Sequence, residues 1–167
     1  MQLKKPVQEE DNSASLAIND KILLASSDKD FKFSMKKSES SGNYMVVNSE
    51  GYMGAYQFGN ARLQDFKNAT GTKFTKKEFL ASKELQDQVF DWHTKDIVSY
   101  INNKGLDKYI GTEVNGVLVT LNGLIAVAHL GGKNGMSKFL NTNGKYNPAD
   151  SNGTTLTNYL NKFKLTE

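Results

Sequence analysis

The sequence predicts a mainly α (α+β) fold in which one small β-hairpin follows the first helix. Three observations indicate this class. Apolar residues recur at helical spacing, between capping residues, over most of the chain. Two short runs, residues 44–47 and 52–56, have strand-like composition on either side of the turn-forming stretch "NSEG". The segment "LNGLIAVAHLGG", residues 121–132, is apolar nearly all round, which is typical of a central, buried helix.

The length of 167 residues predicts one domain. Residues 1–27 are polar and indicate a lead-in or linker, so we place the folded domain at residues 28–167. The lead-in has no signal-peptide pattern, because its apolar stretch is short and interrupted by charge. No apolar run reaches transmembrane length, so membrane insertion is not expected.

Composition narrows the classes of partner. The formal net charge is +3 and the pI is about 8.9, which suits contact with an anionic polymer. Of the 21 basic residues only Arg62 is an arginine, and this scarcity counts against a nucleic-acid reader. The chain has no cysteine, which excludes disulfides and thiolate metal sites.

The first helix is expected to begin near Ser27 or Asp28, with acidic residues at its positive end. Residues 40–42, "SSG", are expected to end it. Glu39 therefore falls in the last turn of a helix, at the edge of the predicted hairpin.

Local signals set the remaining elements. Gly71 is expected to stop a helix that begins after Phe58, and Thr75 with Glu78 forms a capping-box pattern before the next helix. A long helix is expected over residues 82–102. "VNGVLV" predicts a small Asn-Gly hairpin, and Thr120 is expected to cap the buried helix. Two further helices are expected in "KNGMSKFL" and "TTLTNYLNKFK".

Glu39 is the first candidate for chemistry. A carboxyl that is partly buried in a groove can donate a proton to a leaving oxygen. The hairpin beside it offers groups suited to sugar rings: the flat faces of Tyr44, Tyr52 and Tyr56, and the donor and acceptor of Gln57. Cross-strand packing is the competing interpretation of each tyrosine, and it is the preferred one for Tyr52.

The two histidines are interpreted separately. His93 lies among apolar residues of the long helix and is expected to be a core residue. His129 precedes two glycines in the buried helix, and the sequence leaves open whether it is a core or a cleft residue. No acid stands at ligand spacing from either, so no metal site is expected. "NPADSNG" (147–153) resembles part of a calcium loop without its terminal Glu, which favours a turn.

The blocks "ESSGNY", "GYMGAYQFG" and "AVAHLGG", in this order, resemble the lysozyme-like superfamily of soluble lytic transglycosylases, goose-type lysozymes and resuscitation-promoting factors. That resemblance implies a lysozyme-like fold that cleaves the β-1,4 bond between N-acetylmuramic acid and N-acetylglucosamine in peptidoglycan, without a cofactor. It implies that Glu39 is the catalytic general acid and that Gln57 lines the cleft. His129 stands near the place where transglycosylases have a tyrosine that contacts the catalytic carboxyl.

A second carboxylate would decide the mechanism. Glycosidases normally place two acids about the scissile bond, and Glu50 lies where phage lysozymes have an acid in their hairpin. An exposed turn residue is the competing interpretation of Glu50. Some of the families that the sequence resembles use a single catalytic Glu. The resemblance therefore slightly favours a lytic transglycosylase over a muramidase. The alternative function is a non-catalytic glycan-binding module with a degenerate cleft, which the altered third block favours.

The site of action follows from the proposed substrate. Peptidoglycan strands lie in the periplasm or cell wall, whereas no export signal is recognised. Delivery by a dedicated secretion system, by phage lysis or by a phage tail would reconcile the two. An injected toxin would be expected to have an immunity protein as a partner.

Overall fold

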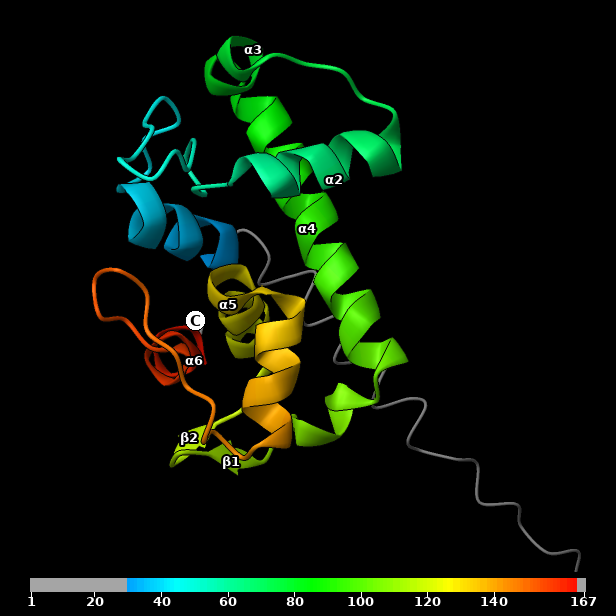
Figure 1. Ribbon diagram of the computed structural model, residues 1–167, viewed down its shortest axis with the longest axis vertical. Helices are drawn as coiled ribbons and strands as arrows, with labels where there is room; N and C mark the ends of the chain where they lie inside the picture. The colour runs from blue at the N-terminus through cyan, green and yellow to red at the C-terminus, as the bar shows by residue number, and fades with distance from the viewer. Residues whose placement is uncertain (1–29, 165–167) are drawn as a thin grey trace, which may run out of the picture.

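The computed structural model describes residues 30–164 as a mainly helical fold with one small antiparallel sheet (Figure 1). The predicted mainly α (α+β) class is confirmed at this level. The elements in chain order are a helix over residues 30–40, α2 (Asn60–Thr70), α3 (Lys76–Ala81), α4 (Lys83–Asn103), the 3-10 helix η1 (Leu106–Tyr109), β1 (Glu113–Val114), β2 (Val117–Leu118), α5 (Leu121–Asn141) and α6 (Leu156–Phe163).

Helix α5 is the centre of the fold, as its apolar sequence predicts. It packs against α6 on one side and α4 on the other (Figure 1). Residues 123–128 of α5 are all buried. At Gly132 the backbone leaves helical geometry with a φ of 75°, and the helix continues to Asn141 beyond this kink. The break at Gly132 thus divides α5 into two helical segments, which confirms the two helices expected on either side of the glycines.

Most predicted helix ends are confirmed by their capping contacts. Gly71 adopts the left-handed conformation that ends α2. Thr75 and Glu78 form the reciprocal hydrogen bonds of a capping box at α3. The Thr120 hydroxyl accepts from the backbone N–H of Gly123 at the start of α5.

The helix over residues 30–40 positions Glu39. It buries Phe31 and Met35 in the core, and its last turn closes where the N–H of Gly42 donates to the carbonyl of Lys36 at 3.0 Å. Gly42 has a φ of 80°, which glycine adopts without strain. Glu39 thus lies in the last turn, as predicted. The predicted start of this helix and the lead-in at residues 1–27 lie outside the described residues.

The prediction of a β-hairpin directly after this helix is wrong, because the segment has no paired strands. Residues 41–59 form a compact loop with isolated antiparallel bridges, Val47 with Met53 and Met53 with Phe58, and no paired strands. The sheet lies instead at β1 and β2, where Asn115 and Gly116 form the turn that "VNGVLV" predicts.

The side chain of Gln86 replaces the strand-to-strand hydrogen bonds that loop 41–59 lacks. This buried amide accepts from the N–H of Ala55 at 2.8 Å and donates to the carbonyls of Tyr44 and Phe79, each at 2.9 Å. One side chain of α4 thereby satisfies backbone groups that a sheet would otherwise pair. Among residues 30–164, no helix is long and apolar enough to cross a membrane.

Candidate active site

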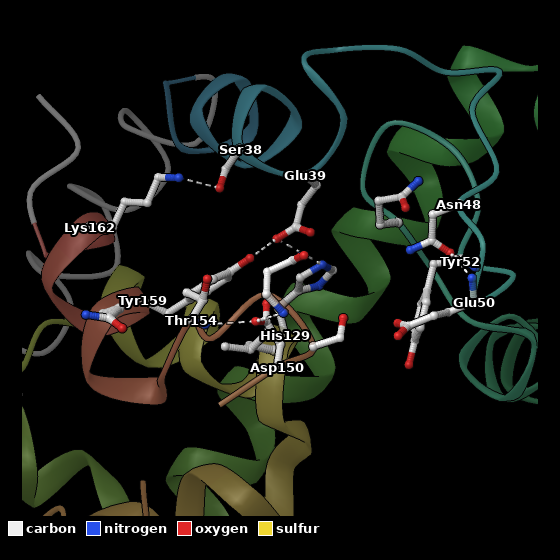
Figure 2. Close-up of a pocket in the computed structure, with 15 residues that line it drawn as sticks. Ser38, Glu39, Asn48, Glu50, Tyr52, His129, Asp150, Thr154, Tyr159 and Lys162 are labelled. Atoms are coloured by element: carbon white, nitrogen blue, oxygen red, sulfur yellow. Dashed lines mark hydrogen bonds and ion pairs between the residues drawn. The ribbon is translucent and has the colours of Figure 1, made fainter. Parts of the chain in front are cut away.

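A groove of about 410 Å³ lies over the end of helix 30–40 and contains Glu39 (Figure 2). Loop 41–59 forms one wall, α6 and the loop before it form the other, and His129 of α5 lies between them (Figure 2). The lining residues are mostly polar: Ser38, Glu39, Asn48, Glu50, Tyr52, Gln57, His129, Leu130, Asp150, Ser151, Asn152, Thr154, Asn158, Tyr159 and Lys162.

Tyr159 holds the carboxylate of Glu39. Its hydroxyl donates to Glu39 Oε1 at 2.6 Å, and the Glu39 side chain is 14% exposed. Burial raises the pKa of Tyr159 well above its usual range, and the neighbouring Glu39 carboxylate raises it further. Tyr159 therefore remains a hydrogen-bond donor at all physiological pH values. Within residues 30–164 we find no hydrogen bond to the second oxygen, Oε2.

His129 lies beside Glu39 at the base of the groove. Its Nε2 atom is 3.9 Å from Glu39 Oε1 and 2.9 Å from the backbone carbonyl oxygen of Tyr56. Its Nδ1 atom is 3.1 Å from Nε2 of His93, which lies behind it on α4. The sequence left His129 open between core and cleft, and the structure places it at the boundary of both.

Three acids line the groove: Glu39, Glu50 and Asp150. Glu50 is exposed on loop 41–59, across the groove from Tyr159 (Figure 2). Asp150 Oδ1 accepts from the N–H groups of Asn152 and Thr154 at 2.9 and 2.8 Å, which fixes its carboxyl in a turn. The sequence predicted that turn but not that it would border Glu39.

The predicted sugar-contacting residues divide into two groups. Gln57 lines the groove, with its amide nitrogen donating to the carbonyl of Gly54 at 3.0 Å. Tyr56 is 0% exposed and donates to Asp87, so its assignment as a sugar-contacting side chain is wrong. Tyr44 is half-buried outside the groove, between Lys36 and Asp87. Tyr52, for which the sequence favoured cross-strand packing, is the loop tyrosine that lines the groove.

Two more residues escaped the sequence analysis. Tyr159 is 120 positions from Glu39, and no local pattern links them. Lys162, one turn further along α6, donates to Ser38 Oγ at 2.6 Å and brings a positive charge to the groove edge. The helical spacing of Tyr159 and Lys162 was the available signal, because residues three apart share a helix face.

No group of three or more potential ligating side chains gathers in the part of the chain that the structure describes, so this part offers no metal centre. No family model, curated protein or solved structure matches this chain.

His93 makes stability depend on pH. Burial lowers the pKa of His93 well below its usual range, and the neighbouring His129, Arg62 and Lys133 lower it further. Between the low folded value and the unfolded value of about 6.5, the unfolded chain binds more protons. The contribution of His93 to the free energy of unfolding should therefore fall as pH drops below about 6.5, by at most about 1.4 kcal/mol per pH unit.

Urea denaturation of the parent and of His93→Gln between pH 5 and 8 measures this dependence. We expect a shallower slope below pH 6.5 in the variant, because glutamine does not titrate. Equal slopes in the two proteins would contradict the assignment to His93.

Proposed function

We propose that this protein cleaves peptidoglycan at the β-1,4 bond between N-acetylmuramic acid and N-acetylglucosamine, with Glu39 as the general acid of a lysozyme-like domain. The observation that carries the proposal is the placement of Glu39: a nearly buried carboxyl at a helix end, held by Tyr159, in an open polar groove. A general acid needs this combination of fixed orientation and access to substrate.

The walls of the groove support a sugar substrate. Tyr52 offers a flat ring, and the side chains of Gln57 and Asn152 offer donors and acceptors for hydroxyl and acetamido groups. The oxygen of Asn48 accepts from the N–H groups of Glu50 and Tyr52, so this side chain offers its amide N–H. The resemblance also implies a tyrosine against the catalytic carboxyl. Here His129 occupies the corresponding sequence block, and Tyr159 of α6 makes that contact instead.

We favour the lytic transglycosylase reaction slightly over hydrolysis. Glu39 gives its proton to the glycosidic oxygen as the bond from C1 of the muramic residue to that oxygen breaks. The 6-hydroxyl of the same residue attacks C1, and its proton passes to the Glu39 carboxylate. The products are a free N-acetylglucosamine 4-hydroxyl and a 1,6-anhydro muramic end, so no second carboxylate is needed.

Glu50→Gln and Asp150→Asn separate the two reactions. If the reaction uses Glu39 as its single acid, both variants should keep most activity and leave 1,6-anhydro ends. With two acids, one variant should be nearly inactive, and the parent should leave ordinary reducing ends because a carboxylate must activate water. Asparagine at position 150 can still accept the turn hydrogen bonds from Asn152 and Thr154. A loss of activity in Asp150→Asn would therefore mean that the reaction needs the negative charge of Asp150. Mass spectrometry of muropeptides measures both, since anhydro products are lighter by one water.

Tyr159→Phe should slow cleavage by about tenfold or more, because the hydroxyl fixes the orientation of the Glu39 carboxyl and a misplacement of about 1 Å can cost about 10²-fold in rate. The ring remains to fill its site, so the fold should be kept. Tyr109→Phe is the matched control, since that hydroxyl donates to Asn141 at the surface. Equal rates for Tyr159→Phe and the control would show that the Tyr159 hydroxyl has no role in cleavage.

Digestion of purified sacculi tests the function itself. Release of soluble muropeptides supports cleavage, whereas pelleting of the protein with sacculi without soluble products supports the alternative, a glycan-binding module. The altered third block, with His129 in place of a tyrosine, is the feature that favours this alternative. The proposed action lies in the periplasm or cell wall, reached by a secretion system or phage delivery, and an immunity protein is the partner to seek if the protein is an injected toxin.

A further inference from the structure

Behind the groove, a line of hydrogen bonds runs from α2 through α4 to α5. Arg62 Nε donates to His93 Nδ1 at 2.8 Å, and His93 Nε2 lies 3.1 Å from His129 Nδ1. His129 Nε2 lies 2.9 Å from the carbonyl oxygen of Tyr56. Both imidazoles are almost fully buried, with His93 6% exposed and the His129 side chain 7% exposed.

The two ends of this line fix every proton within it. The guanidinium of Arg62 can only donate, so His93 Nδ1 must be unprotonated and the His93 proton lies on Nε2. That N–H points at His129 Nδ1, which must then accept, so the His129 proton lies on Nε2. The Tyr56 carbonyl can only accept, and it receives this proton. An extra proton on either ring would set two N–H groups against each other.

The donor end of the line is itself held in place. Arg62 stacks over Trp92, with its guanidinium carbon 4.2 Å from the ring centroid, and pairs with Asp96. Burial opposes ionisation of Asp96, but hydrogen bonds from Lys133 and Arg62 outweigh it and lower the pKa of Asp96. Arg62 therefore keeps its charge and its orientation toward His93.

The other groups that face the two rings do not change this result. His129 faces Glu39 from helix 30–40 and the Phe58 ring from loop 41–59. His93 faces Arg62 and the positive charge of Lys133, both of which disfavour a second cation. The Glu39 carboxylate, 3.9 Å away, favours a charged His129, but the line of hydrogen bonds has no acceptor for the second N–H of such a ring.

We infer that His93, oriented by Arg62, is a positioning residue that fixes His129 as its neutral Nε2–H tautomer and so keeps positive charge away from Glu39. The consequence for Glu39 rests on the proposed function. An imidazolium beside Glu39 would stabilise the carboxylate and withhold the proton that a leaving oxygen needs. The line of hydrogen bonds thus keeps Glu39 a proton donor at pH values where a free histidine would be charged.

Two substitutions at one position test this inference. His93→Gln can place an amide N–H near Nε2 and still donate to His129 Nδ1, whereas His93→Asn can accept from Arg62 but does not reach His129. Long-range ¹H–¹⁵N correlation spectra from pH 5 to 8 report the tautomer and charge of His129 without substrate. We expect a neutral Nε2–H tautomer throughout in the parent and in His93→Gln. In His93→Asn we expect His129 to gain a proton as pH falls.

The pH profile of sacculus digestion is the second readout. Relative to its rate at pH 7.5, His93→Asn should lose about tenfold more activity at pH 5.5 than the parent or His93→Gln, since a cation within about 4–6 Å shifts a carboxyl by a unit or more. A charged or Nδ1–H His129 in the parent overturns the inference even if no variant folds. Matching pH profiles for His93→Asn and the parent overturn it as well. Failure of the parent to cleave sacculi, with the expected spectra, would refute the proposed function and leave the assigned tautomers standing.

Discussion

Replacing Glu39 with Gln is expected to abolish peptidoglycan cleavage while leaving the fold intact. Gln keeps the shape of the side chain and an oxygen that accepts from Tyr159, but it has no proton to give. Loss of a general acid costs about 10²–10⁴-fold in rate. The rate of soluble muropeptide release from purified sacculi measures the loss, with thermal unfolding as the check on the fold.

Glu84→Gln is the matched control for this experiment. It makes the same chemical change in an exposed residue in the first turn of α4, which does not line the groove. The control should digest sacculi at the parental rate. If Glu39→Gln does so too, Glu39 is not the acid, and the proposed mechanism falls with it.

Contacts close in sequence explain what could be predicted of this fold. The capping box of Thr75 and Glu78, the left-handed Gly71 and the Asn115–Gly116 turn each join residues at most four positions apart. Their hydrogen bonds are encoded by residue type and spacing, so the sequence reveals them. The position of Glu39 in a last helical turn was predictable for the same reason.

The composition of the groove was less predictable, because distant segments build it. Tyr159 meets Glu39 only after α6 packs against α5, and Asp150 reaches the groove through the loop before α6. The tyrosines of loop 41–59 show a second limit. The sequence predicted that Tyr56 would present its ring to a sugar, but the loop turns that ring onto Phe90, with the ring centroids 4.2 Å apart. Tertiary packing, rather than local pattern, selects which tyrosine faces the groove.

Gln86→Leu is expected to cause the largest loss of stability among substitutions of buried polar residues in the described chain. Gln86 is 0% exposed, and leucine of similar volume removes its hydrogen bonds with Ala55, Tyr44 and Phe79. The N–H of Ala55 and the part-buried carbonyl of Tyr44 lose their partner, while the Phe79 carbonyl keeps only the N–H of Ser82. Each unpaired group costs about 1–3 kcal/mol. A total of at least about 2 kcal/mol corresponds to a fall in Tm of about 4–8 °C for a domain of this size.

Gln88→Leu provides the comparison, because it makes the same change at an exposed position of α4 and should alter Tm little. The loss in Gln86→Leu should also reach the groove, since this amide holds the loop that carries Glu50, Tyr52 and Gln57. Hydrogen exchange should be faster across residues 44–55 in Gln86→Leu than in Gln88→Leu. Equal Tm values for the two variants would mean that loop 41–59 is held by its apolar contacts, and that the amide of Gln86 is not what fixes the wall opposite Tyr159.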